Sequence, residues 1–153
     1  MIRSIDLRYY IVRPVLTDLG MWSEAAEELM LGTCAVESDL GYYLKQSKGP
    51  ARGIYMVEPD TERDLWDNYI LSHQGIMRIL TKYGVPYMPD DREMIWNLNY
   101  ATAMARLVYW RVPDPLPVKE DIVALETYHK RHYNTHLGKT KKGEFVEKYQ
   151  KYV

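Results

Sequence analysis

The sequence has few of the features that would assign it to a secreted, membrane or nucleic-acid-binding class. Its 153 residues include one cysteine and one phenylalanine, so no disulfide can form within the chain. No run approaches the roughly 18 apolar residues of a membrane-spanning helix, and we expect no membrane insertion. A formal net charge of −1 gives no general attraction for nucleic acid, which we do not expect as a partner.

The single cysteine and the first residues of the chain give no sign of a reactive thiol or of a signal peptide. Cys34 lies in the apolar segment 29–40 with no flanking cationic cluster, so we interpret it as a packing residue rather than a reactive thiol. Residues 1–6 lack a basic region followed by an apolar core and a small-residue cleavage site. We therefore expect synthesis in a cytoplasm without a signal peptide.

Composition and periodicity predict a single, mainly α domain covering residues 1–153. A content of 46% hydrophobic and 27% charged residues suits one globular core. The expected helices cover residues 4–19, 23–41, 61–84, 91–110, 119–133 and 142–152, of which 91–110 is the central buried helix. Ser23 and Thr61 are the expected N-caps of the second and third helices. A kink or break is expected at Pro14 and an interruption at Ser72. We find no period-2 strand and no internal repeat, and expect at most a short irregular hairpin near residues 44–57.

Glu37 is the strongest candidate for chemistry. It stands in Ala35-Val36-Glu37-Ser38-Asp39-Leu40-Gly41, at the end of an apolar helix, and Gly53-Ile54-Tyr55-Met56-Val57-Glu58-Pro59-Asp60-Thr61 begins sixteen residues later. General acid catalysis of glycosidic cleavage needs a carboxyl group that is still protonated near neutral pH. The helical neighbours Thr33, Cys34, Leu40 and Gly41 are uncharged, so we expect burial to favour the protonated form. The plain alternative is a solvent-facing glutamate at a helix end.

These motifs resemble those of the lytic transglycosylases and goose-type lysozymes, most closely the small versions of the domain that tailed bacteriophages encode. Glu37-Ser38 matches the family's Glu-Ser, and Ser47 matches its loop serine. Gly53-Ile54-Tyr55-Met56 falls where the family has Gly-Leu-Met-Gln, and Pro59 and Thr61 match the Pro-x-Thr that follows. Asn97-Leu98 with Ala101 is similar to the family's Asn-Ile-x-x-Gly, and Tyr133-Asn134-Thr135 to its Ala-Tyr-Asn-Ala-Gly.

The resemblance implies a lysozyme-like fold that cleaves peptidoglycan glycan strands between N-acetylmuramic acid and N-acetylglucosamine. Glu37 would be the general acid and then the base, without a cofactor. The expected substrate-binding residues are Ser47, Tyr55, Met56, Glu58, Tyr100, Tyr133 and Asn134. The family needs no second carboxylate, because the substrate's own N-acetyl oxygen or 6-hydroxyl can attack. Attack by the 6-hydroxyl gives an anhydro product and attack by water a hydrated one, and both stay open.

The carboxylates near Glu37, those of Glu58 and Asp39, each allow a catalytic or a structural interpretation. Glu58 is a candidate second acid or base if water is the acceptor, but a glutamate before a proline at a bend is as well explained as a loop or capping residue. Asp39 lies two residues from Glu37, which points it to another side of the helix, and we expect it to be solvated.

Two departures from the family pattern support a rival interpretation. Met56 replaces the family's glutamine and removes an amide that could bind a sugar N-acetyl group. The Ala-Gly after Tyr133-Asn134 is replaced by Thr135-His136-Leu137-Gly138. The rival is a non-catalytic phage virion or assembly protein that keeps the lysozyme-like fold and binds other virion proteins. The chain would act on the cell wall or reside in a virion.

Histidine and aromatic residues offer further sites. His129, His132 and His136 have the spacing of metal ligands on one helix face, but a helix exit near residue 134 favours solvated histidines, and we expect no metal. Fourteen tyrosines against one phenylalanine suit either half-buried packing or a sugar groove. Tyr42 and Tyr43 lie next to the motifs, and the four tryptophans are expected in the core.

Overall fold

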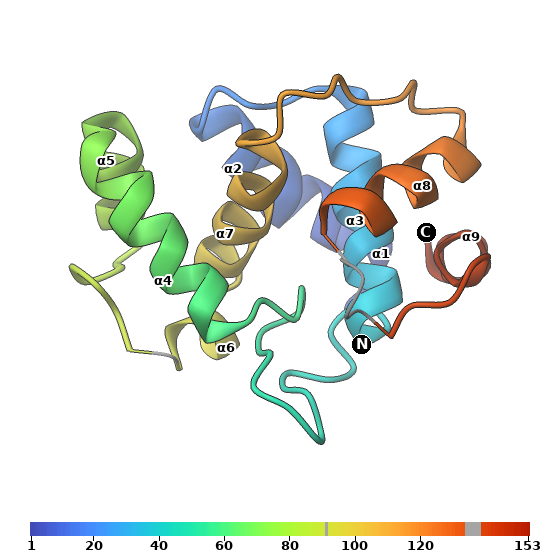
Figure 1. Cartoon of the computed structure of the whole chain (residues 1–153), viewed down its shortest axis with the longest axis horizontal. Coiled ribbons are helices and arrows are strands. Elements are labelled where there is room, and N and C mark those ends of the chain that lie inside the picture. The colour runs from blue at the N-terminus through green and yellow to red at the C-terminus, as the bar shows by residue number, and fades with distance from the viewer. Residues whose placement is uncertain (91, 134–138) are drawn as a thin grey trace.

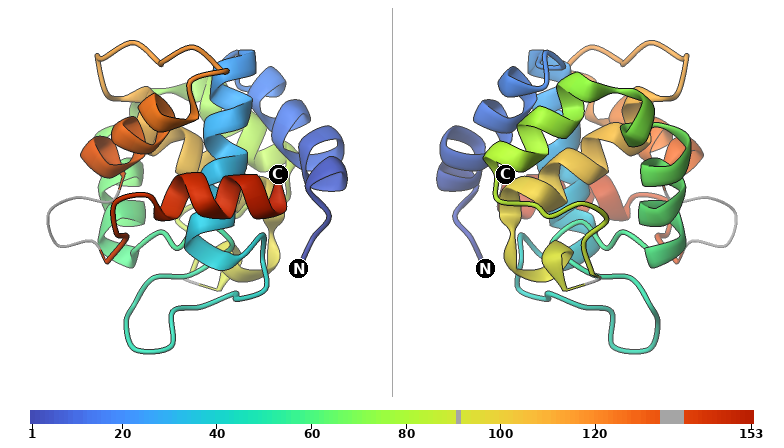
Figure 2. Two further views of the ribbon diagram at one scale, coloured as in Figure 1. Left: turned by 90° about the vertical axis from the view of Figure 1, so that its right-hand side faces the viewer. Right: turned by 90° about the vertical axis from the view of Figure 1, so that its left-hand side faces the viewer.

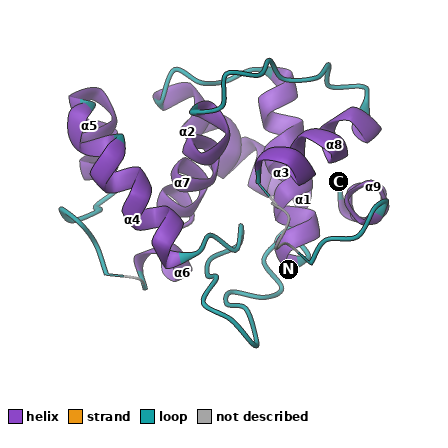
Figure 3. Ribbon diagram, viewed as in Figure 1, coloured by secondary structure: helices purple, strands orange, loops and turns teal. Residues whose placement is uncertain are grey.

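The chain is mainly helical, as its periodicity predicted. The computed structural model describes residues 1–90, 92–133 and 139–153, and in this part of the chain every regular element is a helix (Figure 3). Where a short hairpin was expected, two isolated antiparallel bridges form, Lys45 with Arg52 and Arg52 with Val57. The helices follow one another as α1 (Ser4–Leu7), the π-helical turn η1 (Arg8–Val12), α2 (Arg13–Asp18), α3 (Glu24–Ser38), α4 (Pro59–Asn68), the 3-10 turn η2 (Ile70–Ser72), α5 (Gln74–Lys82), α6 (Glu93–Trp96), α7 (Leu98–Trp110), α8 (Ile122–His132) and α9 (Glu144–Tyr152) (Figure 1).

Helix α3 is the centre of the fold. Its residues 29–35 are all buried, which explains why the segment is apolar on every side rather than along one stripe. Ser23 caps it as predicted, its hydroxyl accepting the Ala26 N–H at 3.0 Å. Helix α7 is buried from Tyr100 to Tyr109 and packs against α3 in the core. Helix α9 crosses α3 on another side (Figure 2).

Several predicted boundaries needed correction. The expected helix 91–110 is interrupted at Asn97, whose side-chain oxygen accepts the Tyr100 N–H at 3.0 Å and so starts α7 afresh. Thr61 does not cap α4, because Pro59 can take the first helical position and moves the start back to Glu58. The break expected near Ser72 is present as η2, and the break expected at Pro14 is present as the π-helical turn before it.

The N-terminal helices are tied to α3 by a buried charge cluster that the sequence did not reveal. The Glu27 carboxylate accepts hydrogen bonds from Arg8 at 2.8 Å, from Arg13 at 2.7 Å and from the Trp22 indole at 2.8 Å. Burial alone would raise the pKa of Glu27, but hydrogen bonds from Arg13, Trp22 and Arg8 outweigh it and lower this pKa to about 2. The carboxylate therefore stays charged and anchors η1 and α2.

The tryptophans are less buried than expected. Trp66 lies in the core, but Trp22, Trp96 and Trp110 are exposed by 42, 59 and 45% of their surface. Trp22 and Trp110 are half-covered by arginine side chains stacked on their rings, from Arg13 and Arg106. The apolar character of these rings predicted burial, whereas the stacked arginine side chains cover part of the ring surface and allow it to stay outside the core.

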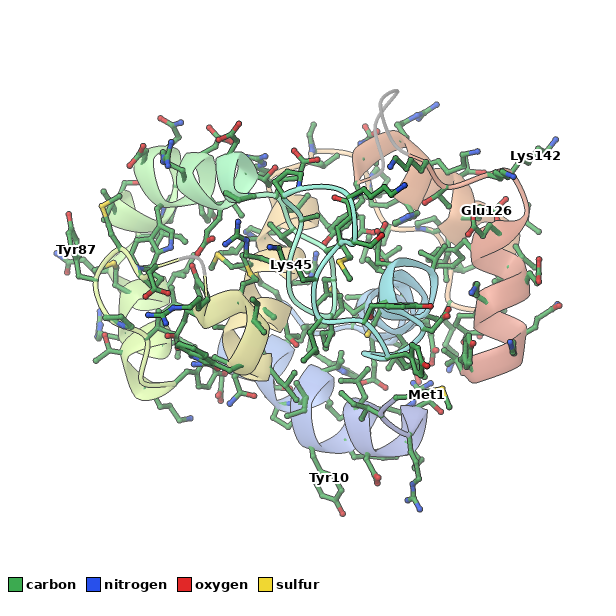
Figure 4. All side chains as sticks on the ribbon, turned by 90° about the horizontal axis from the view of Figure 1, so that it is seen from below. Met1, Tyr10, Lys45, Tyr87, Glu126 and Lys142 are labelled. Atoms are coloured by element: carbon green, nitrogen blue, oxygen red, sulfur yellow. The ribbon has the colours of Figure 1, made fainter. Side chains whose placement is uncertain are left out.

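A long connection between α3 and α4, residues 39–58, projects from one end of the molecule (Figure 1). Lys45 belongs to this connection, and Figure 4 shows it between α4 on one side and α8 and α9 on the other. Over the described ranges, no helix combines the length and the apolar character needed to cross a membrane.

The packing of α9 on α3 gives a stability prediction. A Cβ added to Gly32 would lie 2.1 Å from the Phe145 ring, and this ring is fully buried against His129 and Tyr149. Gly32→Ala should therefore lower the free energy of unfolding by about 1–3 kcal/mol, the usual cost of overpacking. Urea denaturation measures it. Gly75→Ala is the control, since nothing lies within 4 Å of its added Cβ and alanine favours the helix. Equal stability of the two variants would contradict the packing argument.

Candidate functional site

Glu37 lies in the last turn of α3, at the point where the chain leaves the helix. Its side chain is 17% exposed. Asp39 and Leu40 follow in the left-handed conformation, with φ of 51° and 53°. Two consecutive non-glycine residues in this region are unusual and turn the chain sharply away from the helix axis. The turn leaves Glu37 at the border between the core and the surface.

Ser38, the second residue of the Glu-Ser motif, holds this helix end in place. Its buried hydroxyl donates to the Ile54 carbonyl at 2.6 Å and accepts the Gly41 N–H at 2.9 Å. One side chain thus joins α3 to the loop 53–57 and closes the left-handed turn. The serine has a structural reason to follow Glu37.

The loop 53–57 requires its glycine. Gly53 has φ of 77°, and a Cβ there would lie 2.4 Å from the Met94 carbonyl oxygen. Met56 is also left-handed, with φ of 48°. Strained positions of this kind persist where the surroundings hold them, and they are frequent at functional sites.

A cleft of about 720 Å³ opens over Glu37. Five of the predicted residues line it, namely Glu37, Ser47, Met56, Glu58 and Tyr133. Its walls come from the end of α3, the connection 43–51, the start of α4, and the chain around Tyr133 and the start of α9. Three lysines, Lys45, Lys48 and Lys139, and a further carboxylate, Glu144, complete its charged lining.

Two predicted substrate contacts are corrected. Tyr55 and Tyr100 are fully buried and do not line the cleft. The Tyr55 hydroxyl accepts a hydrogen bond from Thr102 at 3.2 Å, and the Tyr100 hydroxyl donates to Glu62 at 2.6 Å. Both rings fill the core beneath the loop, because a large side chain gains more from packing there than from exposure. Asn134, the remaining predicted contact, lies outside the described residues, as do Thr135 to Gly138.

Tyr133 lies at the cleft, but its hydroxyl has a different partner from the one the resemblance implies. The hydroxyl donates to the Tyr55 carbonyl at 2.5 Å. Its ring stacks on Tyr109 and His129, with ring centroids 5.1 and 5.4 Å apart. Burial, followed by the nearby Glu37, raises the pKa of this phenol well above its usual value, so it stays neutral. Tyr133 therefore holds the loop 53–57 at the carbonyl next to the one that Ser38 binds.

The prediction for His129 was also wrong. This residue was expected to be solvated, but it is fully buried. Its Nε2 lies 3.3 Å from Glu37 Oε1, and its Nδ1 lies 2.9 Å from the Tyr109 hydroxyl. The signal was available, since Ile122, Leu125 and His129 recur at spacings of three and four on the buried side of α8.

The other candidate ligands and acids lie apart from this pair. His132 Nε2 is 3.0 Å from Asp114 Oδ2, away from Glu37. Asp39 was expected to be solvated, but it forms an ion pair with Lys148 of α9. In residues 1–90, 92–133 and 139–153, no group of three or more histidine, cysteine, aspartate or glutamate side chains is arranged to hold a metal ion.

Comparison of the chain with protein-family models, with curated proteins and with solved structures finds no match. The interpretation of the cleft therefore depends on its own geometry.

The Tyr133 hydrogen bond predicts a local effect on the loop. Tyr133→Phe should speed amide exchange at Met56 and Val57 about fivefold, the effect of losing about 1 kcal/mol of local stability. Both amides are bonded within the loop, to Gly53 and Arg52. Tyr128→Phe is a matched control on the same helix, because its hydroxyl also donates to a backbone carbonyl, that of Asp114, but far from the loop. Equal exchange at the two amides in both variants would contradict this role.

Proposed function

We propose that the chain is a peptidoglycan-cleaving muramidase, a lytic transglycosylase in class, that cuts the glycosidic bond between N-acetylmuramic acid and N-acetylglucosamine. One observation carries the proposal. The Glu37 carboxyl, mostly buried, lines a cleft of about 720 Å³ and is backed by the buried imidazole of His129. A carboxyl among the few polar groups that line a concave surface is a candidate for catalysis by its position.

In the proposed reaction Glu37 gives a proton to the glycosidic oxygen as the bond to the muramic acid C1 breaks. The resulting carboxylate then takes a proton from the attacking 6-hydroxyl, which closes an anhydro ring. If water attacks instead, the carboxylate takes its proton and the product is hydrated. Each route leaves Glu37 protonated again, so no cofactor or second carboxylate is needed.

The lining of the cleft suits a glycan that carries acidic groups. Its volume lies within the range of about 300–1,000 Å³ that is common for ligand sites. Tyr43, which meets Tyr42 edge to face at 4.9 Å, offers a ring for sugar stacking. Lys45, Lys48 and Lys139 could pair with the carboxylates of peptidoglycan stem peptides.

The second candidate is a non-catalytic virion or assembly protein with the same fold. The observation that favours it is Met56, which lines the cleft and brings a thioether where the family's glutamine would bring an amide. Such a protein would bind glycan strands or other virion proteins through the cleft without cutting them. Digestion of peptidoglycan separates the two candidates.

Glu37→Gln should abolish cleavage without loss of the fold. Glutamine is nearly isosteric but cannot donate the proton, and proton transfer supplies roughly 10² to 10⁴ in rate. Mass spectrometry of purified peptidoglycan after incubation measures anhydromuropeptides or reducing-end muropeptides, and circular dichroism checks the fold. Glu24→Gln is the control, since Glu24 lies at the far, exposed end of the same helix. If the wild-type protein leaves peptidoglycan unchanged, the non-catalytic candidate is favoured. If Glu37→Gln retains full activity, Glu37 is not the general acid.

Met56→Gln should restore an amide to the cleft and tighten binding of N-acetylglucosamine oligomers. Each added hydrogen bond contributes about 0.5–1.5 kcal/mol net, which corresponds to a few-fold up to about tenfold. Isothermal titration measures it. Met88→Gln is a matched control, because Met88 is also left-handed, with φ of 45°, but does not line the cleft. Binding that is unchanged by Met56→Gln, or changed equally by both substitutions, would show that Met56 does not contact the sugar.

A further inference from the structure

His129 carries a buried polar atom that the fold alone does not explain. The imidazole is fully buried, yet its Nε2 has no hydrogen-bond partner of good geometry among the described residues. Buried nitrogen atoms without a partner are rare, because the lost hydration is not replaced. Glu37 Oε1 lies 3.3 Å from this nitrogen. The imidazole is therefore close to the proposed acid but incompletely bonded to it.

A chain of hydroxyl groups determines which imidazole nitrogen carries a proton. The Thr33 hydroxyl donates to the Leu29 carbonyl at 2.7 Å, and a carbonyl can only accept. The Tyr109 hydroxyl, 2.7 Å from the same Thr33 oxygen, must then donate to it. The Tyr109 oxygen is left to accept, so His129 Nδ1, 2.9 Å away, carries a hydrogen. This is the one arrangement that satisfies all three contacts.

The remaining nitrogen, Nε2, then carries the lone pair and lies 3.3 Å from a carboxyl oxygen of Glu37. Two bare acceptors 3.3 Å apart would repel each other, and one proton between them removes the repulsion. We propose that Glu37 and His129 hold one proton in common between Oε1 and Nε2, and that His129 is the positioning residue for the Glu37 carboxyl.

The titratable groups that face this pair from the core stay neutral. From α7 and the end of α8, Tyr109 and Tyr133 face His129, and burial raises the pKa of both phenols well above its usual value. Phe145 of α9 covers the ring at 5.4 Å. On α3, burial raises the pKa of Cys34 to about 12. The charged groups on the open side are those that line the cleft, Lys45, Lys48, Lys139, Glu58 and Glu144.

The catalytic meaning of the pair rests on the proposed function. The shared proton binds Oε1 to the imidazole and leaves Oε2 for the substrate. Before the acid step Oε2 takes up a second proton from the solvent, so that the pair then holds two protons. Oε2 gives this second proton to the glycosidic oxygen, and the carboxylate left behind is stabilised by the Nε2–H of the imidazolium. In the base step Oε2 takes the proton of the attacking hydroxyl, which restores the starting state. His129 keeps its own proton throughout and touches no substrate.

An NMR titration of the His129 ring nitrogens tests the pair without any substrate. In the wild-type chain Nδ1 should stay protonated over the whole titration, while Nε2 titrates. Glu37→Gln removes the carboxylate that stabilises the imidazolium, so the midpoint should move to lower pH. Glu58→Gln, which neutralises another carboxylate of the same cleft, should shift it far less. Equal midpoints in wild type and Glu37→Gln, or an unprotonated Nδ1 at neutral pH, would overturn the proposal.

Two further outcomes separate this inference from the proposed function. If the midpoint shifts but the protein leaves peptidoglycan intact, the shared proton is supported and the proposed enzymatic function is contradicted. If the protein cleaves peptidoglycan but the midpoint does not shift, the enzymatic function is supported and the shared proton is contradicted. In an active protein, His129→Gln should also change the shape of the pH profile of kcat/KM, which a purely structural role would leave unchanged. If His129→Gln fails to fold, the titration of Glu37→Gln still decides the question.

Discussion

The packing of α9 across α3 is the contact on which the site depends. Phe145 fits against Gly32, where no side chain intervenes, and the buried Glu126 carboxylate accepts the Gly143 and Val146 N–H groups at the start of α9. These contacts close the core over His129, whose ring lies 5.4 Å from that of Phe145. Without α9 the imidazole behind Glu37 would be open to water, and the contact between the two side chains would lose its buried setting.

The cleft itself is maintained by two hydrogen bonds to neighbouring carbonyls. Ser38 from the end of α3 binds the carbonyl of Ile54, and Tyr133 from the end of α8 binds that of Tyr55. The loop is thereby held at two successive carbonyls, and Met56 is kept in a left-handed conformation beside Glu37. Ser38 and Tyr133 thus fix the backbone around the Glu37 carboxyl.

Much of the helical order could be read from local signals. Ser23, the break near Ser72 and the separation of α8 from α9 follow from capping and from residues that interrupt a helix, which act over one or two turns. Glu37 and four other residues of the cleft were also identified by their spacing in motifs. The break at Asn97 was missed, because the apolar stripe continues through it and only the side-chain cap reveals a new start.

The mainly helical class, the position of Glu37 at a helix end and the glycine of the loop 53–57 all follow from local features of the chain. The side chains that meet Glu37 come from distant helices and depend on how these pack. His129, 92 positions further along the chain, approaches it through the packing of α8 and α9. Tyr55 and Tyr100 turned inward for the same reason, since a motif fixes the identity of a residue but not the face it presents to the core. Local propensities act along the chain, whereas the partners of a buried polar group are chosen by the elements that enclose it.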